Sequence, residues 1–152
     1  IMPNWCTNRV TVFGEPEEIA KVTQIFKDEK SIFNNIIQSP DWRRLPNEKG
    51  EYAKLEQMKN PDGSVAWETY NFPDGKNDDR WYDWNINNWG TKWDITAKSV
   101  DFQYEDSEQL EVQFETAWAP PEEICYRLRE MFQDLTFTWF YDEPGMCVAG
   151  YL

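Results

Sequence analysis

The chain has 152 residues, a formal net charge of −13 and 40% hydrophobic residues, and 16% of all its residues are aromatic. These proportions are sufficient for one hydrophobic core and predict a single domain over residues 1–152. The sequence contains no histidine, which excludes Ser-His-Asp and Cys-His catalysis and any zinc site that needs imidazole. No apolar run approaches the roughly 18 residues that span a bilayer, so we expect a cytoplasmic protein without membrane contact.

The N-terminal part predicts a strand followed by a helix. Residues 6–13 alternate between two sets of side chains, with Val10 and Val12 facing the core. Pro16 suits the first turn of a helix, because its fixed φ is compatible with that turn and its missing N–H is not needed there. We expect this helix to run to about Asp28.

Residues 31–80 predict an excursion between core elements, since four prolines punctuate a polar run rich in Asn, Asp and Gly. Within it, the sequence NPDG at residues 60–63 is a strong turn signal, because proline presets its own φ and glycine accepts a positive one. The segments at residues 55–58 and 65–70 are predicted to pair as the arms of a small hairpin.

The stretch WYDWNINNWGTKWD at residues 81–94 is dense in tryptophan. Its spacing predicts a helix over residues 81–89, and Gly90 supplies the left-handed residue that ends it. Residues 92–95 are expected to leave this helix as a strand.

Three tryptophans of this helix, Trp81, Trp84 and Trp89, share one predicted face. One interpretation is that the aromatic face packs against the sheet as part of the core. The alternative is that the three rings form a stacking platform for a planar ligand, a base or a partner's side chain. We therefore treat them as candidate binding residues.

The C-terminal part changes from a helical period to a period of two. Residues 100–104 and 110–116 predict an antiparallel hairpin with one wet, acidic face. A second helix is predicted over residues 122–133, followed by strands at residues 136–141 and 146–151.

Several side chains are assigned to the core on these patterns. Tyr104 continues the inward phase of its strand, and Met131 belongs to the apolar stripe of the second helix.

Three cysteines cannot all pair and none lies in a CxxC spacing, so reduced thiols are expected. Cys125 and Cys147 are expected to be buried as small hydrophobic residues.

The order of the core elements predicts the fold class. Two units of strand, Pro-Glu-Glu and helix give an α+β, ferredoxin-like (split βαβ) antiparallel sheet with helices on one face. An extra C-terminal strand and an inserted hairpin/helix region complete this prediction.

Four short motifs carry a resemblance to a known family. They are MPNWCTNR from Met2, WGTKWD from Trp89, TAWAPP from Thr116 and the Gly150-Tyr151 ending. These motifs resemble the ferredoxin-like domain family of YubB-type (Api-like) proteins carried by phages, plasmids and bacterial genomes. The resemblance agrees with the predicted fold, implies an origin in a mobile element and supplies no catalytic residues.

The motif tryptophans Trp89, Trp93 and Trp118 each border a predicted chain reversal. Because aromatic side chains are more often core than site, we expect these three rings to serve packing.

Carboxylates are numerous in the chain and give one alternative function. Those considered for acid–base work or for binding Mg²⁺ or Ca²⁺ are Asp83, Asp94, Asp101, Glu115, Asp142 and Glu143. No calcium loop, GxxxxGK[ST] or GxGxxG motif accompanies them. We therefore predict no cofactor, no metal and no catalytic residue, and keep a carboxylate- or metal-dependent enzyme as the alternative.

The charge is unevenly distributed, with four basic residues against fourteen acidic ones from Trp81 onward. Such a surface disfavours direct binding to nucleic acid, whose phosphates need clustered Lys and Arg. We expect a non-enzymatic binding module that engages a host protein through this acidic half, with Glu111, Gln113 and Glu115 as candidate contacts. A DNA mimic that inhibits a host nucleic-acid-binding protein is a further alternative.

The predicted sheet has two edges, and exposed edges commonly pair unless charges guard them. Since Glu111 and Glu115 partly guard one strand, we expect a monomer or a weak homodimer.

Overall fold

The computed structural model describes residues 3–152, and the chain divides into two compact units. The first comprises residues 1–38 and 85–152, and the second comprises residues 39–84. The second unit falls almost wholly within the segment predicted as an excursion.

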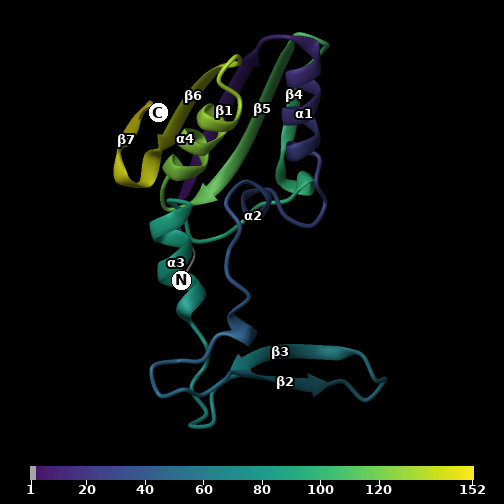
Figure 1. Cartoon of the computed structure of the whole chain (residues 1–152), viewed down its shortest axis with the longest axis vertical. Coiled ribbons are helices and arrows are strands. Elements are labelled where there is room, and N and C mark those ends of the chain that lie inside the picture. The colour runs from purple at the N-terminus through teal and green to yellow at the C-terminus, as the bar shows by residue number, and fades with distance from the viewer. Residues whose placement is uncertain (1–2) are drawn as a thin grey trace. The chain divides into compact units, whose positions relative to one another are not determined.

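The first unit contains a five-stranded sheet in the order β4-β5-β1-β6-β7, in which all neighbouring strands are antiparallel (Figure 1). Its strands are β1 (Trp5–Phe13), β4 (Asp101–Glu105), β5 (Gln109–Ala117), β6 (Thr136–Glu143) and β7 (Val148–Tyr151). The helices of the chain are α1 (Pro16–Phe26), α2 (Phe33–Ile36), α3 (Arg80–Asn88) and α4 (Glu122–Met131). Short 3₁₀ turns occur at η1 (Trp42–Arg44), η2 (Ala97–Ser99) and η3 (Pro144–Met146).

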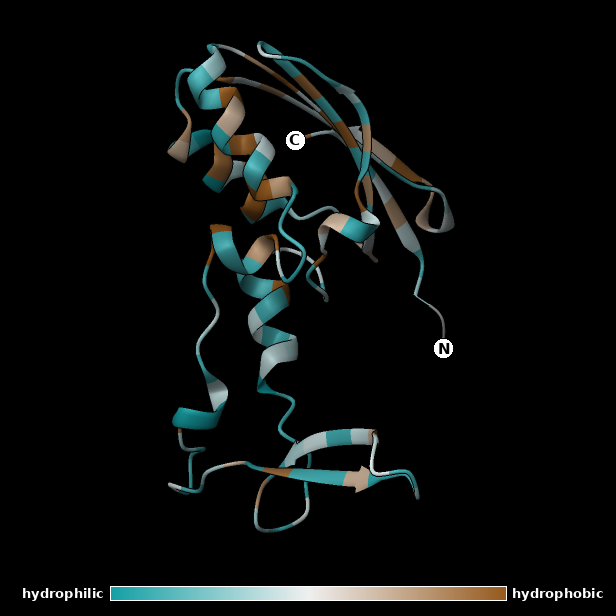
Figure 2. Cartoon of the chain, turned by 90° about the vertical axis from the view of Figure 1, so that its right-hand side faces the viewer, coloured by the Kyte–Doolittle hydropathy of each residue, from teal (hydrophilic) through white to brown (hydrophobic). Residues whose placement is uncertain are grey.

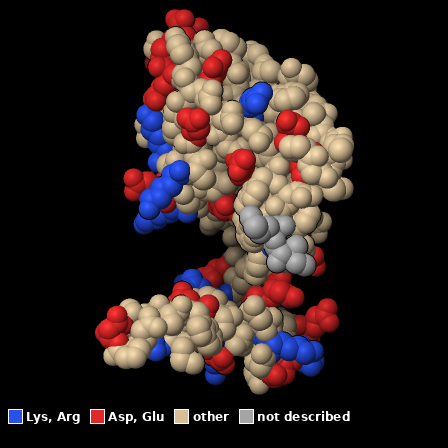
Figure 3. Space-filling model, turned by 180° about the vertical axis from the view of Figure 1, so that it is seen from behind, with Lys and Arg blue, Asp and Glu red and all other residues tan. Residues whose placement is uncertain are grey.

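Helices α1 and α4 lie on the same face of the sheet, and the other face carries no helix (Figure 2). The order β4-β5-β1-β6 with these two helices is the ferredoxin-like split βαβ plan, and β7 adds the extra C-terminal strand. The predicted fold class is confirmed. Figure 3, which views the chain from the side opposite to Figure 1, shows the open face of the sheet, where acidic groups stand apart from one another among uncharged atoms.

Alternation along β1 builds the core. Its side chains are buried at Cys6, Asn8, Val10 and Val12, while the intervening ones point to the open face. Val10 lies opposite Val112 of β5 and Trp139 of β6, which are themselves buried. This period of two therefore places one apolar layer beneath the helices, as the sequence predicted.

One buried amide ties the three central strands together. The side chain of Asn8 in β1 donates from Nδ2 to Oγ1 of Thr116 in β5 at 2.9 Å. Its Oδ1 accepts a hydrogen bond from Nε1 of Trp139 in β6 at 3.0 Å. Because buried polar groups must be paired, this arrangement favours one register of β5 and β6 on β1.

Two core assignments from the sequence are wrong at the ends of elements. Tyr104 is 46% exposed, because the register shifts between Phe102 and Tyr104 and the ring pairs with the outward-facing Glu111. Its hydroxyl donates to Asp106 at 2.6 Å instead. Met131 is exposed where α4 ends, and the next residue, Phe132, takes the buried place on the stripe.

Two further expectations also fail. Cys147 is exposed, because it takes the left-handed conformation (φ 56°) that ends the η3 turn between β6 and β7. Residues 92–95 form a loop and not a strand. The cause is Asp94, whose carboxylate accepts the N–H groups of Phe33 at 2.7 Å and Asn34 at 3.0 Å, so that it caps α2.

The second unit contains a two-stranded antiparallel hairpin of β2 (Lys54–Lys59) and β3 (Val65–Asn71). At its turn Gly63 has a φ of 89° and donates to the carbonyl of Asn60 at 3.0 Å. The predicted hairpin is therefore confirmed. Among residues 39–84 only Ala53 and Asp78 are buried, so this unit has almost no apolar core.

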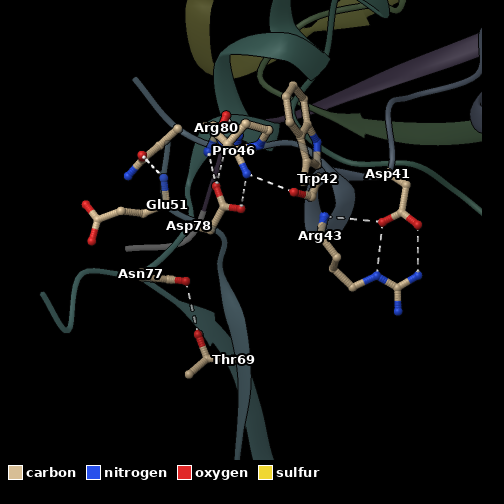
Figure 4. Close-up of polar contacts among 10 residues, drawn as sticks. Asp41, Trp42, Arg43, Pro46, Glu51, Thr69, Asn77, Asp78 and Arg80 are labelled. Carbon is tan, nitrogen blue, oxygen red and sulfur yellow. Dashed lines mark hydrogen bonds and ion pairs between the residues drawn. The ribbon is translucent and has the colours of Figure 1, made fainter. Parts of the chain in front are cut away.

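The second unit buries little apolar surface, and the polar contacts of Arg80 hold its segments together instead (Figure 4). Its Nε and Nη2 donate to the two carboxylate oxygens of Asp78 at 2.8 and 2.9 Å. The same guanidinium donates to the carbonyls of Pro46 at 3.1 Å and Trp42 at 2.9 Å. It also lies 5.1 Å from the ring centroid of Trp42 and 5.2 Å from that of Phe72. One arginine thus joins residues 42–46 and the ring of Phe72 to its own segment at residues 78–80.

This arrangement predicts loss of the second unit in acid. The hydrogen bonds from Arg80 lower the pKa of Asp78 below its ordinary value of about 3.9. Because the folded pKa is the lower one, the stabilisation is complete above the ordinary value and is lost as the pH falls through the folded pKa. We expect the NMR amide signals of β2 and β3 to collapse toward unfolded positions over that range.

The Asp78→Asn variant tests the cause of this transition. It should weaken the second unit at neutral pH and remove the acid transition, whereas Asp79→Asn, at the exposed neighbouring residue, should keep the transition of the parent. An unchanged transition in Asp78→Asn would show that another group controls it.

Candidate functional site

A pocket of about 500 Å³ lies in the first unit, at the C-terminal end of β5. The residues that line it come from β1, β5, the start of β4 and the loop before β4. They are Trp5, Trp93, Asp94, Ile95, Ser99, Asp101, Gln113, Phe114, Glu115, Thr116 and Ala117. We call this feature the β5-end pocket.

The β5-end pocket exists because β4 is shorter than β5. The first residue of β4, Asp101, lies opposite Gln113, so residues 114–117 extend beyond the partner strand. The loop before β4 passes here in place of a strand. It is held by the hydroxyl of Thr91, which donates to the carbonyl of Ala117 at 2.8 Å, and by the Asp94 cap on α2.

Two exposed tryptophans form the aromatic part of the pocket. Trp5 begins β1 opposite Ala117 and is 41% exposed, and Trp93 in the loop is 40% exposed. Their ring centroids are 6.2 Å apart with an angle of 39° between the planes. The ammonium of Lys92 lies 4.6 Å from the centroid of Trp93. This contact indicates that the ring already attracts a cation.

Three carboxylates line the pocket, and they differ in whether they already have hydrogen-bond partners. Asp94 is used by the cap on α2. Asp101 is exposed and accepts from Nε2 of Gln103 at 3.0 Å. Glu115 is exposed, and within residues 3–152 its carboxylate has no hydrogen bond or ion pair. Glu115 therefore offers a negative charge to a ligand without first losing a partner.

The three candidate residues predicted on β5 line two depressions. Gln113 and Glu115 line the β5-end pocket. Glu111 lines another depression, of about 210 Å³, together with Gln113, Arg9 and Gln103. The arginine has no ion pair with a residue in the described part of the chain.

The three candidate tryptophans of α3 also fall in different surroundings. Trp89 is 4% exposed, and its Nε1 donates to the carbonyl of Ile37 at 2.9 Å, so it belongs to the core. Trp81 lines a pocket of about 280 Å³ in the second unit, with Trp42 and Tyr70 among its other walls. Trp84 is partly buried. A platform that includes Trp89 is therefore excluded by its burial.

Two of the motif tryptophans expected in the core lie at the surface. Trp93 is 40% exposed and Trp118 is 42% exposed. Trp5 was not predicted as a site residue, although the phase of β1 contains the signal. Since Cys6 and the alternate residues after it face the core, Trp5 must face the open side.

Parts of three of the four motifs meet near the β5-end pocket, whereas the Gly150-Tyr151 ending lies on β7, at the other edge of the sheet. The N–H of Trp118 donates to the carbonyl of Asn4 at 2.8 Å, and a Cβ on Gly90 would lie 2.8 Å from the backbone nitrogen of Glu122. Gly145, which lies outside the motifs, also approaches Asn4, since a Cβ there would lie 2.6 Å from the side-chain Cγ of Asn4. Met2, the first residue of the first motif, lies outside the described residues. These contacts between motifs hold this end of the sheet together. The first and second motifs also supply Trp5 and Trp93 of the pocket.

The reactive side chains give little support to catalysis. Burial raises the pKa of the Cys6 and Cys125 thiols to about 11, so that neither is a thiolate at neutral pH. Within residues 3–152, no group of three Cys, Asp or Glu side chains is placed to hold a metal ion. No helix in this part of the chain is long and apolar enough to cross a membrane.

Comparison with known proteins agrees with the fold and the motifs. Residues 88–152 match the family model described as a ferredoxin-like domain in Api92-like protein. The crystal structure of a protein api92 from Yersinia pseudotuberculosis is similar over 98% of this chain and 93% of its own, with a TM-score of 0.59 and 13% identity. No curated protein matches the chain. The expected resemblance to an Api-like family is confirmed, and at this identity the solved structure supports the fold alone.

The different burial of two motif tryptophans predicts different costs on truncation. Trp89→Ala should lower the free energy of unfolding by about 3–5 kcal/mol, because it leaves a cavity in the core. Trp93→Ala should cost about 2 kcal/mol less, because its ring buries less apolar area. Urea denaturation of both variants measures this difference. Equal losses of unfolding free energy would mean that Trp89 is not a core residue or that Trp93 is not a surface residue.

Proposed function

We propose that this protein is a non-enzymatic binding module of phage or plasmid origin that engages a basic host protein in the cytoplasm. The contact surface is the open face of the sheet, centred on the β5-end pocket. The observation that carries the proposal is the pocket itself, where exposed Trp5 and Trp93 adjoin the unpaired carboxylate of Glu115. Exposed aromatic rings beside polar groups are typical of residues that anchor protein partners.

Charge supports a basic partner over an acidic one. Residues 85–152 hold four basic residues against thirteen acidic ones. Two of the acidic side chains, Asp101 and Glu115, are exposed in the pocket, and Glu111 lies farther along the same strand. A partner rich in Lys and Arg would be attracted over a distance and oriented on this face.

The same surface gives less support to the two alternatives. A DNA mimic needs carboxylates in rows at the spacing of phosphates, whereas acidic groups on the open face are separated by uncharged atoms (Figure 3). A carboxylate- or metal-dependent enzyme needs acidic side chains that converge, and in the pocket the Asp94 carboxylate is already used by backbone N–H groups.

Affinity capture from a lysate of the host tests the proposal through its salt dependence. We expect one partner to be retained at about 0.1 M salt and released at about 1 M, where the Debye length falls from about 10 Å to about 3 Å. The Glu115→Lys variant should lose the same partner at low salt, because it places a like charge in the contact.

The control is Glu29→Lys, which makes the same change of charge at an exposed residue in the loop after α1. This variant should retain the partner. Capture of no partner, or of one that is insensitive to both salt and Glu115→Lys, would contradict the proposed function.

A further inference from the structure

The chemistry of the β5-end pocket points to one kind of side chain. We propose that it receives an arginine side chain from a basic segment of the partner, an inference that rests on the proposed function. Its volume of about 500 Å³ lies within the range of about 300–1,000 Å³ that is usual for sites enclosing a small ligand.

The aromatic walls favour a cation with a flat face. Trp5 and Trp93 are tilted by 39° with centroids 6.2 Å apart, so the two indoles are not stacked face to face. Tryptophan is the best aromatic partner for a cation, and a guanidinium stacks on an indole as well as being attracted by it. The ammonium of Lys92 over Trp93 is an internal example of the same attraction.

The carboxylates favour arginine over lysine. Glu115 has both oxygens free of partners within the described residues, and a planar guanidinium can donate two parallel hydrogen bonds to such a carboxylate. The ammonium of lysine is a point charge that is more strongly hydrated, so its transfer to an aromatic pocket is less favourable. A guanidinium can therefore use the rings and the carboxylate together.

The surroundings favour an arginine within a protein segment over a free cation. The pocket adjoins the open sheet face, where β5 continues to Gln113 and then to the depression at Glu111. A segment with several basic residues could place one arginine in the pocket and a second charge beside Glu111. Arg9 lines the depression at Glu111, sits opposite Gln113 and forms no ion pair with Glu111 or Glu115.

Calorimetric titration of the full chain with three synthetic peptides tests this inference. The capped peptides contain three repeats of Gly-Arg, Gly-Lys or Gly-citrulline, the last being a neutral isostere of the first. We expect the arginine peptide to bind about tenfold more tightly than the citrulline peptide and measurably more tightly than the lysine peptide. Equal affinities for arginine and citrulline, or for arginine and lysine, would overturn the inference.

Variants locate the binding in the pocket. Glu115→Gln and Trp93→Leu should each weaken the arginine peptide by about fivefold or more. Trp118→Leu is the matched control, because Trp118 is equally exposed but does not line the pocket, and it should bind like the parent. Glu115→Gln changes an exposed side chain and is expected to fold, so it remains decisive if Trp93→Leu does not. Unchanged affinity in Glu115→Gln would place the peptide elsewhere.

The outcomes separate this inference from the proposed function. A salt-sensitive partner captured by a chain that does not prefer arginine would leave the proposed function in place and remove the inference. Preference for the arginine peptide without any captured partner would support the pocket chemistry and count against the proposed host protein.

Discussion

The buried side chain of Asn8 is the constraint on which the sheet and its pocket both depend. It accepts from Trp139 and donates to Thr116, so that three adjacent strands share one buried polar contact. A shift of β5 by one residue would bury Glu115 and separate the amide from Thr116, which makes other registers costly. With the register fixed, Trp5 lies opposite Ala117 and Glu115 lies opposite Thr7 on the open face.

A second set of contacts turns this end of the sheet into a pocket. Thr91 and Asp94 hold the loop before β4 by hydrogen bonds to the backbone. The position of Trp93 in this loop therefore does not depend on burial of its ring. Burial of the ring would have been the usual way to fix a tryptophan. Because polar contacts fix the loop instead, the ring remains partly exposed beside Trp5. Rigid support beneath exposed side chains is what a preorganised binding surface requires.

The sequence predicted the elements that have a clear period and missed those that have none. The alternation in β1 and β5 and the Pro-Glu-Glu helix starts were sufficient for the fold class and for the position of Gln113 and Glu115 on the outer face of β5, and the NPDG turn was sufficient for the hairpin. The exposure of Trp93 was not predictable, because a loop has no period and the cap by Asp94 depends on α2, which is distant in sequence. The bulge that exposes Tyr104 and the left-handed Cys147 are likewise set by strand pairing and turn geometry. The excursion was predicted at residues 31–80, and the second compact unit comprises residues 39–84.

The most direct test of the account uses the indole N–H signals of the nine tryptophans in an NMR titration with the arginine peptide. We predict that the signals of Trp5 and Trp93 shift together with the amides of residues 113–117, because these groups line the β5-end pocket. The signals of the buried Trp89 and Trp139 should remain in place. Shifts confined to Trp81, Trp42 and the hairpin would contradict this assignment, because they would place the binding site in the second unit.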